Sequence, residues 1–93
     1  MIIVGTDYKL NCTVNIALTD MVSAALSIQA PNGSIVEYDA TASGTMLSAD
    51  ITAVQNTTIG EHRVWAEINF LGSVVRKSGA KVFTVWPEGS LQV

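Results

Sequence analysis

The stretch Glu61-His62-Arg63-Val64-Trp65-Ala66-Glu67-Ile68-Asn69-Phe70 has the clearest pattern in this chain of 93 residues. Positions 62, 64, 66, 68 and 70 carry His, Val, Ala, Ile and Phe, and the positions between them carry polar residues and a tryptophan. A period of two residues places alternate side chains on opposite sides of an extended backbone. The stretch therefore predicts a half-buried β-strand.

Shorter runs of the same kind lie on both sides of this stretch, and Gly, Asn, Pro or Ser interrupts them about every ten residues. The predicted strands cover residues 8–16, 24–30, 35–39, 47–51, 61–70, 74–76 and 82–86. Residues 19–25 are compatible with a brief helix but lead without a break into the second strand. Residues 40–43 are predicted to be loose, and Ser78-Gly79 to bend or interrupt the sixth strand. The pattern predicts one antiparallel β-sandwich of about seven strands over residues 1–93, with an arm at 1–5 and a tail at 87–93.

The composition favours a protein that works inside an assembly. Charged residues make up 14% of the chain, whereas about 25% is usual. A net charge of −3 disfavours nucleic-acid binding, which needs a basic face. The one basic cluster, Arg76, Lys77 and Lys81, is interpreted as solvated residues at a strand edge. No stretch has the pattern of a secretory signal or the length of a membrane span, which predicts synthesis and assembly in a cytoplasm.

The residues that often carry chemistry are isolated. Cys12 is the single cysteine and lies on the apolar side of its run, so it is interpreted as a small buried hydrophobe. His62 is the single histidine and is interpreted as structural, because no second histidine can complete a metal set. The carboxylates are scattered, and no nucleophile elbow or phosphate-binding glycine loop is present. We therefore expect no catalytic residue, no cofactor and no metal.

Two sets of apolar residues are candidates for contacts with other proteins. Trp65 and Trp86 each cover a sheet face within the domain or anchor a partner, since tryptophan contributes strongly to interfaces. The arm and the tail either pair within the domain or add to a neighbour as strands or apolar plugs. The candidate interface residues are Ile2, Ile3, Val4, Trp65, Trp86, Leu91 and Val93.

Several turn and core positions resemble a known family. Pro31-Asn32-Gly33-Ser34 stands where many phage proteins have a "PDG-S/T" turn. The stretch 58–68 resembles their "G-x-W-x-x-x-A-x-V" strand, and Phe83-Thr84-Val85 resembles the closing "F-x-V". In the G-x-W pattern the tryptophan follows the glycine by two residues. In this chain His62 stands two residues after Gly60, and Trp65 comes three residues later, so the aromatic residue is displaced. Over nearly its whole length, the chain resembles small immunoglobulin-like structural proteins of tailed bacteriophages. It is also similar to the N-terminal domain of phage upper baseplate proteins.

The resemblance implies an immunoglobulin-like sandwich that serves as a non-enzymatic virion subunit. Such a subunit is an adaptor or connector in the tail, baseplate, fibre root or neck. Its partners are other virion structural proteins, and it occurs in many copies in a symmetric particle. Two alternatives stay open: a capsid decoration protein, and a module that binds a cell surface or a carbohydrate.

Overall fold

The structure is a computed structural model that describes residues 1–89. Within that range the chain forms two β-sheets and no helix. The strands are β1 (Ile2–Ile3), β2 (Tyr8–Thr13), β3 (Met21–Gln29), β4 (Ile35–Asp39), β5 (Thr41–Ser43), β6 (Met46–Ile51), β7 (Gly60–Phe70), β8 (Val74–Lys77) and β9 (Lys81–Trp86).

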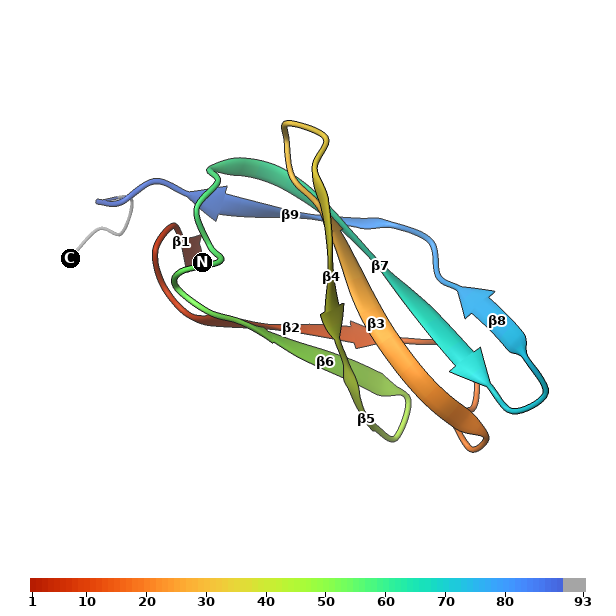
Figure 1. Ribbon diagram of the computed structural model, residues 1–93. Helices are drawn as coiled ribbons and strands as arrows, with labels where there is room; N and C mark the ends of the chain where they lie inside the picture. The colour runs from red at the N-terminus through yellow and green to blue at the C-terminus, as the bar shows by residue number, and fades with distance from the viewer. Residues whose placement is uncertain (90–93) are drawn as a thin grey trace.

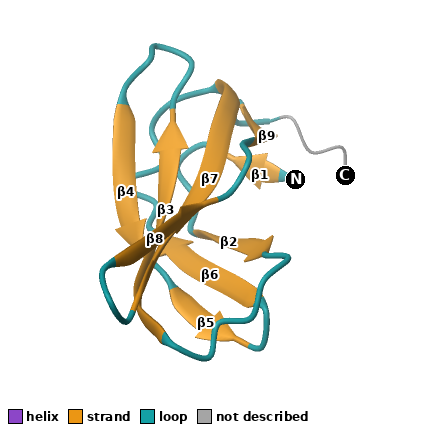
Figure 2. Ribbon diagram, turned by 90° about the vertical axis from the view of Figure 1, so that its right-hand side faces the viewer, coloured by secondary structure: helices purple, strands orange, loops and turns teal. Residues whose placement is uncertain are grey.

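The two sheets form the layers of a β-sandwich (Figures 1 and 2). Sheet A has the order β1-β9-β7-β3-β4, with β8 also paired to β7, and sheet B has the order β2-β6-β5. The order β9-β7-β3-β4 opposite β2-β6-β5 matches strands G-F-C-C′ and B-E-D of an immunoglobulin-like sandwich. All pairs are antiparallel except that of β1 with β9. The expected sandwich is confirmed.

The strand count and several strand boundaries differ from expectation. β1 and β5 are additional short strands, where the sequence predicted an arm and a loose segment. β2 ends at Thr13, three residues before the predicted end. β3 begins at Met21, so the stretch 19–25 does not form a helix. Strands of two or three residues have too few residues to show a period, and the partner of β1 lies far away in the sequence.

The strongest alternating stretch becomes β7, the longest strand of sheet A. It pairs with β3 along one edge and with β8 and then β9 along the other. The expected interruption at Ser78 separates β8 from β9. There, Ser78 donates its backbone N–H to the Ala66 carbonyl at 2.9 Å. In return its Oγ accepts the Ala66 N–H at 2.8 Å. The side chain thus completes hydrogen bonding that the interrupted ladder leaves open.

The core lies between the sheets, built from alternate residues of β3, β6 and β7. Its buried members are Val14, Ala24, Leu26, Ile28, Leu47, Ala49, Ile51, Ala66 and Ile68. Cys12 is a free, half-buried cysteine that packs against this cluster. Sheet B is narrower than sheet A, and Val36 on the inner face of β4 stays about half exposed. Sheet B therefore covers only part of the inner face of sheet A.

Candidate functional site

The N-terminal arm is paired within the domain. Ile2 and Ile3 lie opposite Val85 and Trp86 in a parallel pair, and Val4 donates its N–H to the Trp86 carbonyl at 2.9 Å. All three arm residues are partly buried. Of the two alternatives for the arm, the structure therefore has the pairing inside the domain.

Asn56 holds the chain where it leaves this arm. Its side chain is 4% exposed, and its Nδ2 donates to the carbonyls of Ile3 at 2.8 Å and Thr6 at 2.9 Å. The backbone carbonyl of Asn56 accepts the Gly5 N–H at 2.8 Å. The side-chain amide and the backbone carbonyl of one buried residue thus satisfy three polar backbone groups at the crossing from sheet A to sheet B.

The two tryptophans lie on the face of sheet A that points away from sheet B, which we call the outer face. Trp65 lies opposite Ser27 in the β3–β7 ladder. Ser27 is only 2% exposed although it belongs to this face, so its neighbours cover it. Trp86 lies at the end of β9, opposite Ile3. The two tryptophans are several ladder positions apart and do not form one cluster. Leu91 and Val93 lie outside the described residues.

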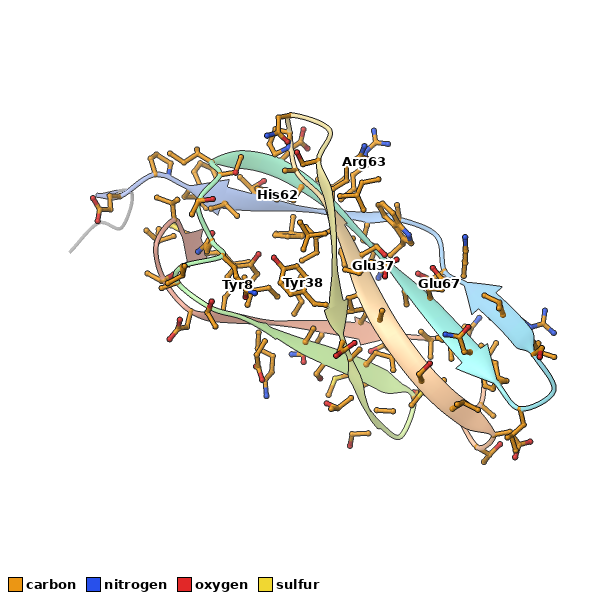
Figure 3. All side chains as sticks on the ribbon, in the orientation of Figure 1. Tyr8, Glu37, Tyr38, His62, Arg63 and Glu67 are labelled. Carbon is orange, nitrogen blue, oxygen red and sulfur yellow. The ribbon has the colours of Figure 1, made fainter. Side chains whose placement is uncertain are left out.

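Aliphatic residues also reach solvent on the outer face. Four large apolar side chains there are between 45% and 57% exposed: Ile35, Val75, Val82 and Trp86. Polar and charged residues alternate with them across the ladders. Arg63 and Glu67 stand two residues before and after Trp65, and Glu37 lies beyond Ser27 on β4 (Figure 3). The outer face is therefore a mixed surface on which exposed apolar side chains alternate with polar and charged ones.

A second feature is a cavity of about 180 Å³ at one end of the sandwich, which we call the end pocket. Its walls come from the start of β2, from β3 and β4 with the turn between them, from the connection between β6 and β7, and from the start of β7. Its lining consists of Tyr8, Ile28, Ala30, Asn32, Ser34, Val36, Tyr38, Gln55, Asn56, Thr57, Thr58 and His62.

His62 forms part of the pocket wall. The residue is 6% exposed, and its ring stacks on Phe83 with a centroid distance of 5.1 Å and an interplanar angle of 22°. Its Nδ1 lies 3.0 Å from the Gly60 carbonyl oxygen. A carbonyl only accepts, so Nδ1 carries the proton, and in the neutral ring Nε2 is a hydrogen-bond acceptor. The structural role expected for His62 is present, and the same ring borders the pocket.

Two tyrosines from different sheets meet in the end pocket (Figure 3). Burial raises the pKa of Tyr8 to about 12, and the neighbouring Tyr38 adds to the increase. Burial also raises the pKa of Tyr38. Both phenols therefore stay protonated and neutral at physiological pH, and each can donate and accept a hydrogen bond. The Tyr8 ring also contacts Phe83, with centroids 6.1 Å apart.

Sequence reasoning did not identify the end pocket. Tyr8, Tyr38 and His62 each occupy an inward position of a different strand, and local alternation indicates only that they point inward. Their meeting depends on how the two sheets are stacked. A signal available in the sequence was the presence of large polar aromatic residues at inward positions where aliphatic residues are usual.

Two other kinds of site are missing from residues 1–89. No three His, Cys, Asp or Glu side chains in this range gather closely enough to hold a metal ion. The same part of the chain has no helix with the length and apolar character needed to cross a bilayer.

A scan against protein-family models, a search of curated proteins and a search of solved structures each found no match for this chain.

Proposed function

We propose that this protein is a non-enzymatic structural subunit of a tailed-bacteriophage virion, acting as an adaptor or connector between larger virion proteins. The proposal combines the resemblance of the turn and strand motifs with a surface suited to assembly. The observation that carries it is the outer face of sheet A, with its exposed Ile35, Val75, Val82 and Trp86.

The outer face supports contact because of where its apolar residues lie. One face of an antiparallel sheet commonly packs on the core while the other faces water and is polar. Here β4, β8 and β9 each place at least one large apolar side chain on the water-facing side. A contiguous partner surface would remove these side chains from water, at a gain of about 25 cal/mol per Å² of apolar area.

The low charge of the chain supports the same function. With 14% charged residues, like-charge repulsion between copies is weak, whereas soluble solitary domains commonly carry more surface charge. Such a surface permits close packing of many copies in a symmetric particle.

The test is the protein content of purified particles. Mass spectrometry of virions from the phage that encodes this chain should detect it in many copies. A Val82→Glu variant should be incorporated less, because it places a carboxylate in the buried contact. Val54→Glu is the matched control, since Val54 is 87% exposed and lies away from the outer face. Virions that lack the protein would overturn the proposal.

A further inference from the structure

We propose that the end pocket binds one neutral, hydroxyl-rich ring, namely a single pyranose sugar residue. The inference goes beyond the structural function proposed above and does not depend on it. It rests on the size of the cavity, on the absence of charge in its lining and on the polar groups that converge there.

The size of the cavity restricts the ligand to a small molecule. Its volume of about 180 Å³ exceeds by far the roughly 10–15 Å³ of such space that one water molecule needs. It is below the range of about 300–1,000 Å³ that is usual for drug-sized ligands. A single six-membered ring with its substituents is therefore the appropriate scale.

The lining excludes a charged ligand. Among the described lining residues there is no Lys, Arg, Asp or Glu. An anion would find no cationic partner, and a cation would find no carboxylate, so either would lose hydration without compensation. The two phenols are neutral at physiological pH, because the ordinary phenol pKa of 10.0 already lies well above it and burial raises the pKa further. The ligand that this pocket recognises is therefore uncharged.

The polar groups match a ligand with several hydroxyls. The phenol hydroxyls of Tyr8 and Tyr38 form no hydrogen bond with the described residues. In its neutral form, His62 offers Nε2 as an acceptor, since its Nδ1 proton is directed to the Gly60 carbonyl. Thr57 and Thr58 add hydroxyls to the pocket wall. Each of these groups can bind a ligand hydroxyl as donor, acceptor or both.

Three amides in the lining are already partly occupied, which limits the roles left to them. The Oδ1 of Asn32 accepts the Ser34 N–H at 3.0 Å, and the Oε1 of Gln55 accepts the Thr52 N–H at 3.0 Å. Asn56 Nδ2 binds two carbonyls of the arm connection. The NH₂ groups of Asn32 and Gln55 remain as donors. The pocket thus presents both donors and acceptors, which are required to pair with sugar hydroxyls.

Apolar surface completes the match. Ile28 and Val36 lie beside the aromatic rings of Tyr8 and Tyr38 in the lining. A pyranose has C–H groups on its ring faces and hydroxyls at its rim. A pocket with apolar walls and a few placed polar groups suits such a molecule better than a fully polar or a fully apolar one.

The experiment is a titration of the isotopically labelled full chain with monosaccharides, followed by backbone amide chemical shifts. D-Glucose, D-galactose and N-acetyl-D-glucosamine are the neutral probes, and D-glucuronate and D-glucosamine are the charged ones. We expect at least one neutral sugar to bind with a Kd on the order of 1 mM. The shifted amides should belong to the pocket lining. The charged probes should bind at least several-fold more weakly.

Variants that remove only a hydroxyl identify the site. Tyr8→Phe and Tyr38→Phe keep both rings, and each should weaken binding by about 3- to 10-fold, the loss expected for one hydrogen bond. Thr84→Val removes a hydroxyl on the outer face and should leave affinity unchanged. Methyl glycosides of the bound sugar distinguish the two possible sources of the ligand, a glycan terminus and a free monosaccharide. If they bind as well as the free sugar, the site accepts the terminal residue of a glycan, and if they fail, it takes the free monosaccharide.

The inference is overturned if no neutral sugar shifts the pocket amides at concentrations up to about 50 mM, roughly fifty times the expected Kd. It is also overturned if the double variant Tyr8→Phe/Tyr38→Phe is folded, as shown by its amide spectrum, and binds the sugar as the unmodified protein does. Neither result affects the proposed virion function, which is tested by the composition of purified particles.

Discussion

At the scale of single residues, Gly60 occupies a position that other residues cannot easily take. It begins β7 with a φ of +120°, and a Cβ at this position would lie 3.0 Å from Cγ of Pro31. The backbone angle is outside the regions that L-residues favour, and the contact with the proline ring is closer than normal packing allows. Gly60 therefore allows the entry of β7 to lie against the turn between β3 and β4.

We expect Gly60→Ala to destabilise the fold by about 1–3 kcal/mol, the usual cost of strained backbone. Gly79→Ala is the matched control, because its Cβ would meet no atom within 4 Å. Chemical denaturation of both variants, with the free energy of unfolding extrapolated to water, measures the difference. Equal stability of the two variants would contradict the role assigned to Gly60.

The buried phenol of Tyr8 makes the stability of the fold vary with pH in the alkaline range. Its pKa in the folded state is about 12 against an ordinary value of 10.0, so the folded protein retains a proton that the unfolded chain loses first. The contribution of Tyr8 is complete below about pH 10 and disappears as the pH rises through about 12.

We therefore expect the free energy of unfolding to fall between pH 10 and 12 more steeply in the unmodified protein than in Tyr8→Phe. Urea denaturation at several alkaline pH values provides the measurement, and absorbance at 295 nm follows phenol ionisation directly. Identical slopes for the two proteins would show that Tyr8 titrates normally in the folded state.

At the scale of elements, β1 is too short to be stable alone and depends on Asn56. Its two residues pair with β9. Where the chain then crosses to sheet B, the carbonyls of Ile3 and Thr6 accept hydrogen bonds from Asn56 Nδ2. The attachment of the first strand is therefore a property of one buried side chain in a distant connection.

We expect Asn56→Ala to cost about 1–3 kcal/mol, because it removes the side-chain donor to the Thr6 carbonyl and one of the donors to the Ile3 carbonyl at a part-buried site. Asn69→Ala is the control, since its Nδ2 binds the Ser23 hydroxyl at an exposed site, and it should cost less than about 1 kcal/mol. Thermal unfolding measures both, and amide hydrogen exchange at Val4 and Gly5 should accelerate only in Asn56→Ala. Unchanged exchange at these two amides would contradict the anchoring role.

Most elements were predictable from sequence, and the short ones were not. The range 61–70 was expected as a strand and matches β7 except for one residue at its start. The predicted strand 35–39 matches β4. By contrast, β5 was predicted as a loose segment, since Thr41, Ala42 and Ser43 have no apolar alternation. These residues become a strand because β6 offers its open edge directly beside them.

At the scale of the whole molecule, the fold depends on aliphatic side chains that join the two sheets. Leu26 from sheet A and Leu47 from sheet B are both fully buried in the same cluster. The described residues contain no disulfide or metal cluster to supplement this core. Stability therefore depends on close packing between β3, β6 and β7.

We expect Leu47→Ala to destabilise the protein by about 2–5 kcal/mol, which combines lost burial with the cavity left behind. Leu71→Ala is the control at a side chain that is 67% exposed, and it should change stability by less than about 0.5 kcal/mol. Urea unfolding followed by tryptophan fluorescence distinguishes the two. A small effect of Leu47→Ala would mean that the interface between the sheets is not the main source of stability.

The sequence by itself determined which segments extend and which side chains turn inward. His62, Ala66 and Ile68 were expected on the core side of β7 and lie there, because side-chain direction along a strand follows from local geometry with a period of two. The tertiary structure alone decided which inward side chains meet. Tyr8, Tyr38 and His62 share one cavity, and the arm pairs with β9. These contacts join segments distant in sequence, and their choice depends on the packing of two whole sheets, for which a local pattern contains no information.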